Sequence, residues 1–347
     1  MATVENEKIT ISLFGGGWPT NIGNSFIGLG SIHLLKTAIP NSKIHVVSGQ
    51  SRWMFGMSRR SSKDKLLIRS ARMLPKWMLR AAKRSMKDRL LKKVSSNVKY
   101  SFDLMNVIES DYAVFPGNAL YEDFVKLYEP IFMKLKENRV KIIFVGAGGA
   151  TYSDSEIIVV TKLLKTINPY AFISRDEQAF KNYEDLAQYS HNGIDCGFFV
   201  NDCFTPARLG LPRYVILNFD KHPEPKLNIK DKLIIRTHHS CWPNGLPKNH
   251  LSKPNTLISD LPDDYLNLYA NTEELHSDRV HACVAALSFE RPCKLYIDAF
   301  DELRASLLDK VGAMTIKDKL TYPDTKKIEK EKEKQIRFLS KIFATKE

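Results

Sequence analysis

A late stretch of the chain, residues 274–296, reads ELHSDRVHACVAALSFERPCKLY. Ser277 and Asp278 are typical helix N-cap residues, because a short side-chain oxygen accepts hydrogen bonds from the free amides of the first turn. Apolar residues then recur at helical spacing, which predicts a helix with one stripe facing a core. The residues of that stripe are Val280, Cys283, Val284 and Leu287. We expect the helix to end before Pro292 and a buried strand to follow.

The start of this predicted helix is a candidate anion site. Arg279 and His281 fall in its first turn, where the amides lack a helical partner and the helix dipole is positive. Both side chains would add charge-assisted donors there. They lie about 200° apart around a helix of ~3.6 residues per turn, so they share a ligand only beyond the helix end. The alternative is a capped surface helix whose arginine meets solvent or a carboxylate.

The composition indicates a soluble globular protein of two domains. The chain has 347 residues, of which 43% are hydrophobic and 26% charged, which is ordinary for such proteins. No apolar run approaches the ~20 residues of a membrane span, and the first residues do not resemble a secretory signal. Five cysteines without a CxxC pair argue against structural disulfides and a thiolate zinc site, and they fit a reducing cytoplasm.

The net charge of +13 belongs to one segment. Residues 52–93 hold fifteen Lys and Arg against two acids, an excess equal to that of the whole chain. Trp, Met and Leu alternate with these charges, which suits a pair of basic helices on an anionic membrane surface. The alternative is a helical insertion that packs on its domain with its charges solvated. A nucleic-acid partner is not expected, because the rest of the chain is formally neutral.

Three early segments predict strands of a parallel sheet. Residues 8–14 alternate and run into a glycine-rich loop and a helix, residues 141–149 are nearly all apolar, and residues 170–176 end in Arg175 and Asp176. Ligands of such α/β sheets collect outside the carboxyl ends of the strands, so Arg175 is a candidate anion ligand. Asp176 is either a second site residue or the cap of the following helix.

A later strand, residues 231–239, ends in His238 and His239. A histidine at a strand end can protonate, donate to a phosphate or bind a metal. We expect no metal, because no further ligand sits at a suitable spacing nearby. A structural role is the alternative for either histidine. Which of the two faces a cleft is left open.

Several of these motifs together resemble the polysaccharide pyruvyltransferase family. Residues 277–282, SDRVHA, followed by Arg291-Pro292 before a strand, are similar to that family's C-terminal signature, Ser-x-Arg-Leu-His-Ala. Residues 174–176 resemble its strand-end Ser-Arg-Asp. Residues 194–198 resemble its Asp-x-x-Phe segment, which closes the first domain.

A fourth match departs from the family pattern. The family has Asn-x-Gly-Asp before the first helix, and this chain has Asn21, Gly23 and Asn24 in that motif. An amide replaces the family's acid at Asn24, so any role of a carboxylate at this point is lost or moved. The glycine-rich loop before the motif does not have the spacing of a dinucleotide fingerprint.

The resemblance implies a GT-B-like α/β fold, in which two Rossmann-like domains with parallel sheets face a cleft. It implies the transfer of a pyruvyl group from phosphoenolpyruvate to two hydroxyls of a sugar, which gives a cyclic ketal on a polysaccharide or its precursor. Arg279, His281 and the first-turn amides would hold this donor, and Arg175 would reach its other anion. The proton donor would be His281 or His239, because imidazole titrates near neutral pH.

The remaining candidates follow from the same motifs. Asp176 is the further catalytic candidate. The further substrate-binding candidates are Asn21, Gly23, Asn24, Ser277 and His238. The scheme requires no cofactor and no metal.

The predicted domains are residues 1–205, which include the basic insertion 52–93, and residues 206–316. Residues 317–347 predict a solvated helix rich in Lys and Glu. We expect a cytoplasmic protein, with attachment to the inner face of the plasma membrane through the basic segment as an alternative.

Two other functions remain open. A GT-B glycosyltransferase would use the same cleft and helix start for the diphosphate of a nucleotide sugar. A catalytically silent scaffold of a membrane-associated polysaccharide assembly would suit the basic segment and the loss of the acid at Asn24.

Overall fold

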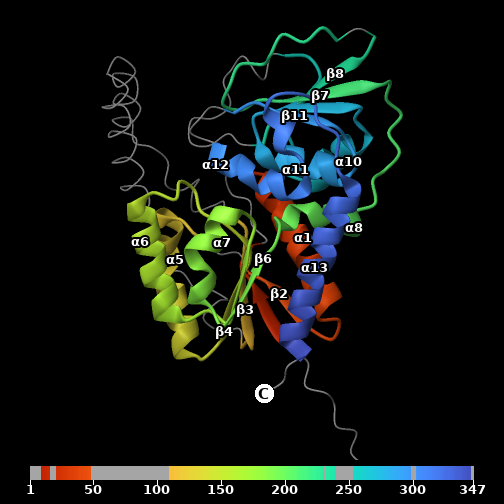
Figure 1. The fold of residues 1–347 in the computed structure, drawn as a ribbon. Helices are drawn as coiled ribbons and strands as arrows, with labels where there is room; N and C mark the ends of the chain where they lie inside the picture. The colour runs from red at the N-terminus through yellow and green to blue at the C-terminus, as the bar shows by residue number, and fades with distance from the viewer. Residues whose placement is uncertain are drawn as a thin grey trace, which may run out of the picture.

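The computed structural model describes residues 9–15, 21–47, 109–229, 231–239, 253–297 and 302–344. These residues form two lobes, each built on a parallel sheet (Figure 1). The predicted basic helices of residues 52–93 lie outside them. No helix in the described part of the chain is long and apolar enough to cross a membrane.

The first lobe contains six strands in the order β2-β1-β3-β4-β5-β6, all parallel. The strands are β1 (Thr10–Leu13), β2 (Lys43–Val46), β3 (Tyr112–Pro116), β4 (Lys141–Ala147), β5 (Ala171–Ser174) and β6 (Tyr189–Asn192). The helices that follow them are α1 (Gly23–Ala38), α5 (Glu122–Glu137), α6 (Asp154–Ile167) and α7 (Glu177–Tyr183).

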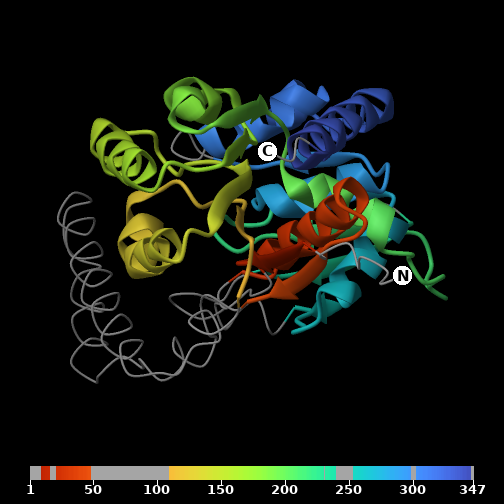
Figure 2. The same cartoon turned by 90° about the horizontal axis from the view of Figure 1, so that it is seen from below.

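Both faces of this sheet are covered, as Figure 2 shows, with α5 and α6 (yellow) on one side and α1 (red) on the other. Successive side chains of a strand point to opposite faces. Val114 therefore packs in the cluster that contains α1, whereas Ala113 and Phe115 pack in the cluster under α5 and α6. Burial of both faces explains why the sequence of β4 is almost continuously apolar.

The second lobe contains five parallel strands in the order β11-β10-β7-β8-β9. They are β7 (Tyr214–Asn218), β8 (Leu233–Thr237), β9 (Thr256–Leu257), β10 (Glu274–Ser277) and β11 (Cys293–Leu295). Two helices, α10 (Pro262–Asn271) and α11 (Val280–Ser288), pack on the face that points toward the first lobe. The two parallel sheets confirm the expected α/β fold class.

Each sheet has a topological switch point, where the order of its strands along the sheet reverses direction. In the first sheet β1 lies between β2 and β3, and in the second β7 lies between β8 and β10. Open α/β sheets bind ligands outside the carboxyl ends of their strands at such points, because the loops on either side diverge and leave room. The loops after β1 and β7 are therefore the places where the topology favours a site.

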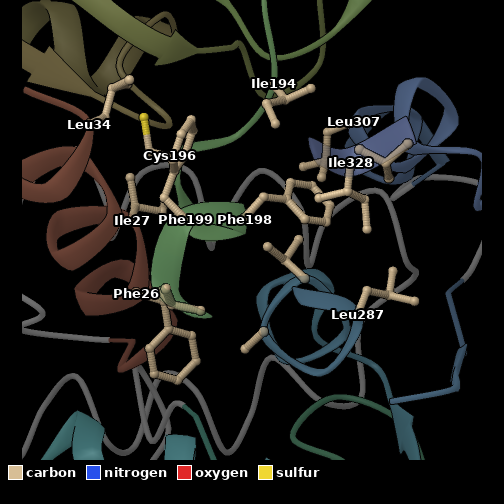
Figure 3. Close-up of a cluster of buried hydrophobic side chains, with 14 of the residues drawn as sticks. Phe26, Ile27, Leu34, Ile194, Cys196, Phe198, Phe199, Leu287, Leu307 and Ile328 are labelled. Carbon is tan, nitrogen blue, oxygen red and sulfur yellow. The ribbon is translucent and has the colours of Figure 1, made fainter. Parts of the chain in front are cut away.

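The lobes share one hydrophobic core (Figure 3). It joins Phe26 of α1, Phe199 of the short helix η3 (Cys196–Phe199) and Leu287 of α11. A β-carbon at Gly30 would lie 1.8 Å from the carbonyl oxygen of Cys196, so only glycine lets α1 lie this close to η3. Short elements complete the junction. They are α8 (Val200–Cys203), α12 (Glu302–Ala305), η4 (Ser306–Val311) and η5 (Met314–Lys317), with η2 (Glu184–Leu186) in the first lobe.

The expectation of a solvated helix over residues 317–347 is wrong, because the helix spans Thr325–Ala344 and buries one face. The helix α13 (Thr325–Ala344) returns to the first lobe and lies beside α1 (Figure 1). Its buried residues form one stripe at helical spacing: Ile328, Lys332, Gln335, Leu339, Ile342 and Phe343. Lys332 is buried because its ammonium meets Asn201, Asp202 and Glu329. The many Lys and Glu residues of the opposite face concealed this amphipathic pattern.

We predict that Leu339→Ala lowers the free energy of unfolding by about 2–5 kcal/mol, because it opens a cavity under a fully buried side chain. The matched change Glu333→Ala removes an exposed ion pair from the same helix and should cost no more than about 0.5 kcal/mol. Urea denaturation measures both values. Equal small effects would show that α13 does not pack on the first lobe.

Candidate functional site

Residues of both lobes line a cavity of about 130 Å³. Most of them follow the carboxyl end of a strand. The first lobe provides Asn21 and Asn24 after β1, Asn118 after β3 and Arg175 after β5. The second provides Lys221 after β7, His239 after β8, Asp278, Arg279, Val280 and His281 after β10, and Ile297 after β11, and Leu307 comes from η4. The cavity thus joins the two switch points.

Asp195 links the two lobes beside this cavity. Its Oδ2 accepts a hydrogen bond from Arg175 Nη1 at 3.2 Å and lies 3.6 Å from His281 Nε2. Its Oδ1 accepts from the amide of Gly197 at 2.8 Å and so caps η3. Arg175 also donates through Nη2 to Asn118 at 3.2 Å. One buried carboxylate therefore brings Arg175 and His281 together.

The ionisation of Asp195 follows from these contacts. Burial would raise its pKa, but His281 and Arg175 outweigh burial and lower the pKa to about 2. A carboxyl with a folded pKa below its unfolded value of about 3.9 stabilises the fold fully above that value. The contribution disappears as the pH falls toward about 2. Asp195 is therefore negatively charged throughout the neutral range.

Arg279 is held in the same way within the second lobe. Its Nε donates to Asp220 Oδ2 at 2.6 Å, and the same oxygen accepts from the amide of His239 at 3.1 Å. Burial would raise the pKa of Asp220, but His238 and Arg279 outweigh it and lower that pKa. Within the described residues, the two terminal nitrogens of Arg279 make no hydrogen bond.

The predicted N-cap is wrong. The helix α11 begins at Val280 with Arg279 as its N-cap, and no side chain caps it. Ser277 instead ends β10, because its pairing with β7 and β11 extends to that residue. The Ser277 Oγ accepts from the Arg279 amide at 2.8 Å and donates to Asn218 Oδ1 at 2.9 Å. The sequence predicted the helix but not its first residue, because Ser277, one of the two expected N-cap residues, is the last residue of a strand.

Asp278 has a different role from a cap. Its carboxylate accepts hydrogen bonds from the amides of Asp220, Lys221 and His222, at 3.1, 2.6 and 2.8 Å. It thereby fixes the turn after β7 and sets Lys221 in the cavity wall. Asp278 itself also lines the cavity.

Asp176 is a helix cap in this structure. Its Oδ1 accepts from the amide of Ala179 at 2.8 Å at the start of α7, and the hydroxyl of Tyr152 donates to it at 2.8 Å. The side chain is buried and is not part of the cavity lining. Of the two interpretations, the structure therefore favours the cap over a catalytic role.

Residues 21–24, which we call the Asn21 motif, lie against the second lobe. Asn21 Oδ1 accepts from the amide of Gly23 at 3.0 Å, and Asn21 and Asn24 both line the cavity. A β-carbon at Gly23 would lie 2.8 Å from His281 Cβ and 3.2 Å from His239 Nδ1. Glycine is needed here for this close approach.

Of the strand-end histidines, His239 lines the cavity and His238 does not. His238 Nδ1 lies 3.1 Å from Asp220 Oδ1, so it supports the carboxylate that holds Arg279. His239 Nε2 lies 2.6 Å from the hydroxyl of Tyr269. Burial lowers the pKa of His239 to about 3, so this imidazole is neutral at neutral pH.

Sequence reasoning missed the residues that support the site. Asp195 was noted only as part of a segment that closes a domain, and Asp220, Asn118 and Lys221 were not singled out. In the structure Asp195 follows β6, Asp220 and Lys221 follow β7, and Asn118 follows β3. A position after a strand end is also the signal that identified Arg175. In the described part of the chain no group of three or more His, Cys, Asp or Glu side chains is arranged to hold a metal ion.

Solved structures of sugar-nucleotide enzymes share this fold. A UDP-GlcNAc 2-epimerase from Neisseria meningitidis, bound to UDP-GlcNAc, aligns with a TM-score of 0.50 at 14% identity over 96% of this chain and 98% of that chain. A putative UDP-N-acetylglucosamine 2-epimerase from Listeria monocytogenes aligns with a TM-score of 0.51 at 13% identity over 96% of this chain and 90% of that one. These alignments confirm the GT-B-like architecture.

The family is shown by sequence. No protein of curated function matches the chain. The family model for polysaccharide pyruvyl transferase matches residues 21–293, which run from the Asn21 motif through α11 to the start of β11. This span covers most of the chain and contains Arg175, Arg279 and His281. The chain therefore belongs to the polysaccharide pyruvyl transferase family.

Proposed function

We propose that this protein transfers a pyruvyl group from phosphoenolpyruvate to two hydroxyls of one sugar in a polysaccharide or its precursor. The products are a cyclic pyruvate ketal and inorganic phosphate. The observation that carries the proposal is the meeting of Arg175, Arg279 and His281 at one cavity. Family membership supports the group that is transferred, and the charges around the cavity support a small donor with two anionic groups.

The number of unused N–H donors on Arg175 and Arg279 supports the binding of an anion. A guanidinium has five N–H donors. Within the described residues Arg175 uses two of them, on Asp195 and Asn118, and Arg279 uses one, on Asp220. The remaining donors suit phosphate and carboxylate, which arginine binds through paired N–H groups. The first-turn amides of α11 add further donors on the same side.

In the proposed reaction His281 gives a proton to the methylene carbon of phosphoenolpyruvate, and the central carbon becomes cation-like. One sugar hydroxyl attacks that carbon and returns its proton to the imidazole. The second hydroxyl then forms the other C–O bond as the bond to the phosphate oxygen breaks, and its proton leaves with phosphate. His281 is preferred to His239 as the acid, because the low pKa of His239 leaves it without a proton to give.

We predict that Arg279→Ala weakens phosphoenolpyruvate binding by about 100-fold or more while the fold persists, because charge-assisted hydrogen bonds contribute about 1.5–3 kcal/mol each. Isothermal calorimetry measures the affinity. The control is Arg236→Ala. This arginine lies on β8, is paired with Glu224 and does not line the cavity. An unchanged affinity in Arg279→Ala would remove this residue from the site.

The same calorimetry, with a thermal-shift panel of phosphoenolpyruvate and nucleotide sugars, separates the other functions. Stabilisation of the protein by nucleotide sugars alone would favour a glycosyltransferase. No stabilising ligand at all would favour a silent scaffold.

We predict that Asp195→Asn lowers kcat at least about tenfold, because the charge that holds Arg175 and His281 is lost. The amide oxygen of Asn can still cap η3 through the Gly197 amide. Asp176→Asn is the matched control, because it also removes a buried carboxylate that caps a helix and lies 4.0 Å from Arg175 Nε, and it leaves His281 untouched. Steady-state kinetics with a thermal melt of each variant measures this. Equal losses of kcat would show that Asp195 has no special role.

A further inference from the structure

A chain of buried polar side chains crosses the second lobe behind the cavity. Every member has at most 4% of its surface exposed. We call this chain the relay, and its members in order are Ser277, Asn218, Thr237, Tyr269 and His239. It begins beside the backbone of Arg279 and ends on an imidazole that lines the cavity.

The direction of the first links follows from groups that can only donate. The amide of Arg279 donates to Ser277 Oγ at 2.8 Å, so the Ser277 hydroxyl proton is free to go to Asn218 Oδ1 at 2.9 Å. Asn218 Nδ2 then donates to the carbonyl oxygen of Thr237 at 2.9 Å and to its Oγ1 at 3.0 Å. The carbonyl fixes the amide orientation, because a flipped amide would place two acceptor oxygens together.

The last links fix the histidine. Since Thr237 Oγ1 accepts from Asn218, its own proton goes to the Tyr269 oxygen at 3.1 Å. The Tyr269 hydroxyl then donates to His239 Nε2 at 2.6 Å. The opposite direction would leave the Thr237 proton without an acceptor among the described residues, and a buried unsatisfied donor costs about 1–3 kcal/mol. Nε2 is therefore the acceptor nitrogen of this imidazole.

The other nitrogen of the ring then bears the proton. A neutral imidazole has one N–H, and the low pKa of His239 makes the ring neutral. In the described part of the chain Nδ1 is buried and has no hydrogen-bond partner. It lies close to Gly23, 3.2 Å from a β-carbon placed there, and the same β-carbon would lie 2.8 Å from His281 Cβ. Edge contacts with Phe26 and Tyr265, at centroid distances of 5.6 and 5.7 Å, hold the ring in place.

We propose that His239 is a neutral hydrogen-bond donor to the bound substrate through its Nδ1–H, and that the relay fixes this tautomer. Tyr269 is then a positioning residue, because it acts only through His239. The donor would meet an oxygen of the substrate, and it differs from the proton-transfer role of His281. The inference rests on the proposed function only for the identity of that substrate.

The first test needs no ligand. Two-dimensional nitrogen-15 NMR of the full chain with labelled histidine reports which ring nitrogen is protonated, and His239→Gln assigns the signal. We expect the Nδ1–H form in the wild type and a shift toward Nε2–H in Tyr269→Phe. Tyr265→Phe is the matched control, because its hydroxyl bonds the carbonyl of His238 and is not part of the relay. An Nε2–H or doubly protonated ring in the wild type overturns the proposal.

The second test measures the contact with substrate. The side-chain amide of Asn overlays Nδ1 of histidine, whereas that of Gln overlays Nε2. We expect His239→Gln to weaken phosphoenolpyruvate binding about tenfold or more, and His239→Asn to retain most of the affinity. Calorimetry measures both, with circular dichroism as the check of folding.

The outcomes separate the two proposals. If the wild type does not bind phosphoenolpyruvate, the proposed function fails, and the NMR measurement still decides the tautomer. If the wild type binds it and His239→Gln binds equally well, the donor role of His239 fails while the proposed function stands.

Discussion

The cavity depends on two ion pairs, the buried pair of Arg175 with Asp195 and the partly buried pair of Arg279 with Asp220. A buried guanidinium without a partner would be very costly, so each lobe provides a carboxylate for its own arginine. Each acid occupies only one edge of the guanidinium, which leaves the other donors for an anion. Asp195 also reaches His281, so a charge from the first lobe positions an imidazole of the second. Binding geometry and the relation of the lobes therefore depend on the same carboxylate.

Close approach of backbones makes this arrangement sterically feasible. The helix α1 touches η3 at Gly30 and the second lobe at Gly23, and a β-carbon at either position would collide with its neighbour. Through these contacts the start of α1 packs closely against His239 and the first turn of α11. The conformational freedom of glycine is not used here, because the need is for space alone. Gly23 and Gly30 thus allow α1 to pack closely against its neighbours.

The sequence predicted the parts of the fold that depend on local pattern. Alternating or apolar runs identified β1, β4, β5, β8 and β11, and helical spacing identified α11. Arg175, Arg279 and His281 were recognised from short motifs at strand ends. Asp195 and Asp220 were missed because their importance comes from partners 20 and 59 positions away, which no local spacing reveals. The burial of α13 was missed because charged residues outnumber apolar ones along it, and the basic segment 52–93 lies outside the described residues.

The return of α13 to the first lobe has a mechanical result. The chain passes from the first lobe to the second after α8 and comes back before α13, so two covalent tethers join the lobes. Separation of the lobes would expose the apolar side chains that Phe26, Phe199 and Leu287 bury in the shared core. The two crossings and this core together oppose a large rearrangement of one sheet relative to the other.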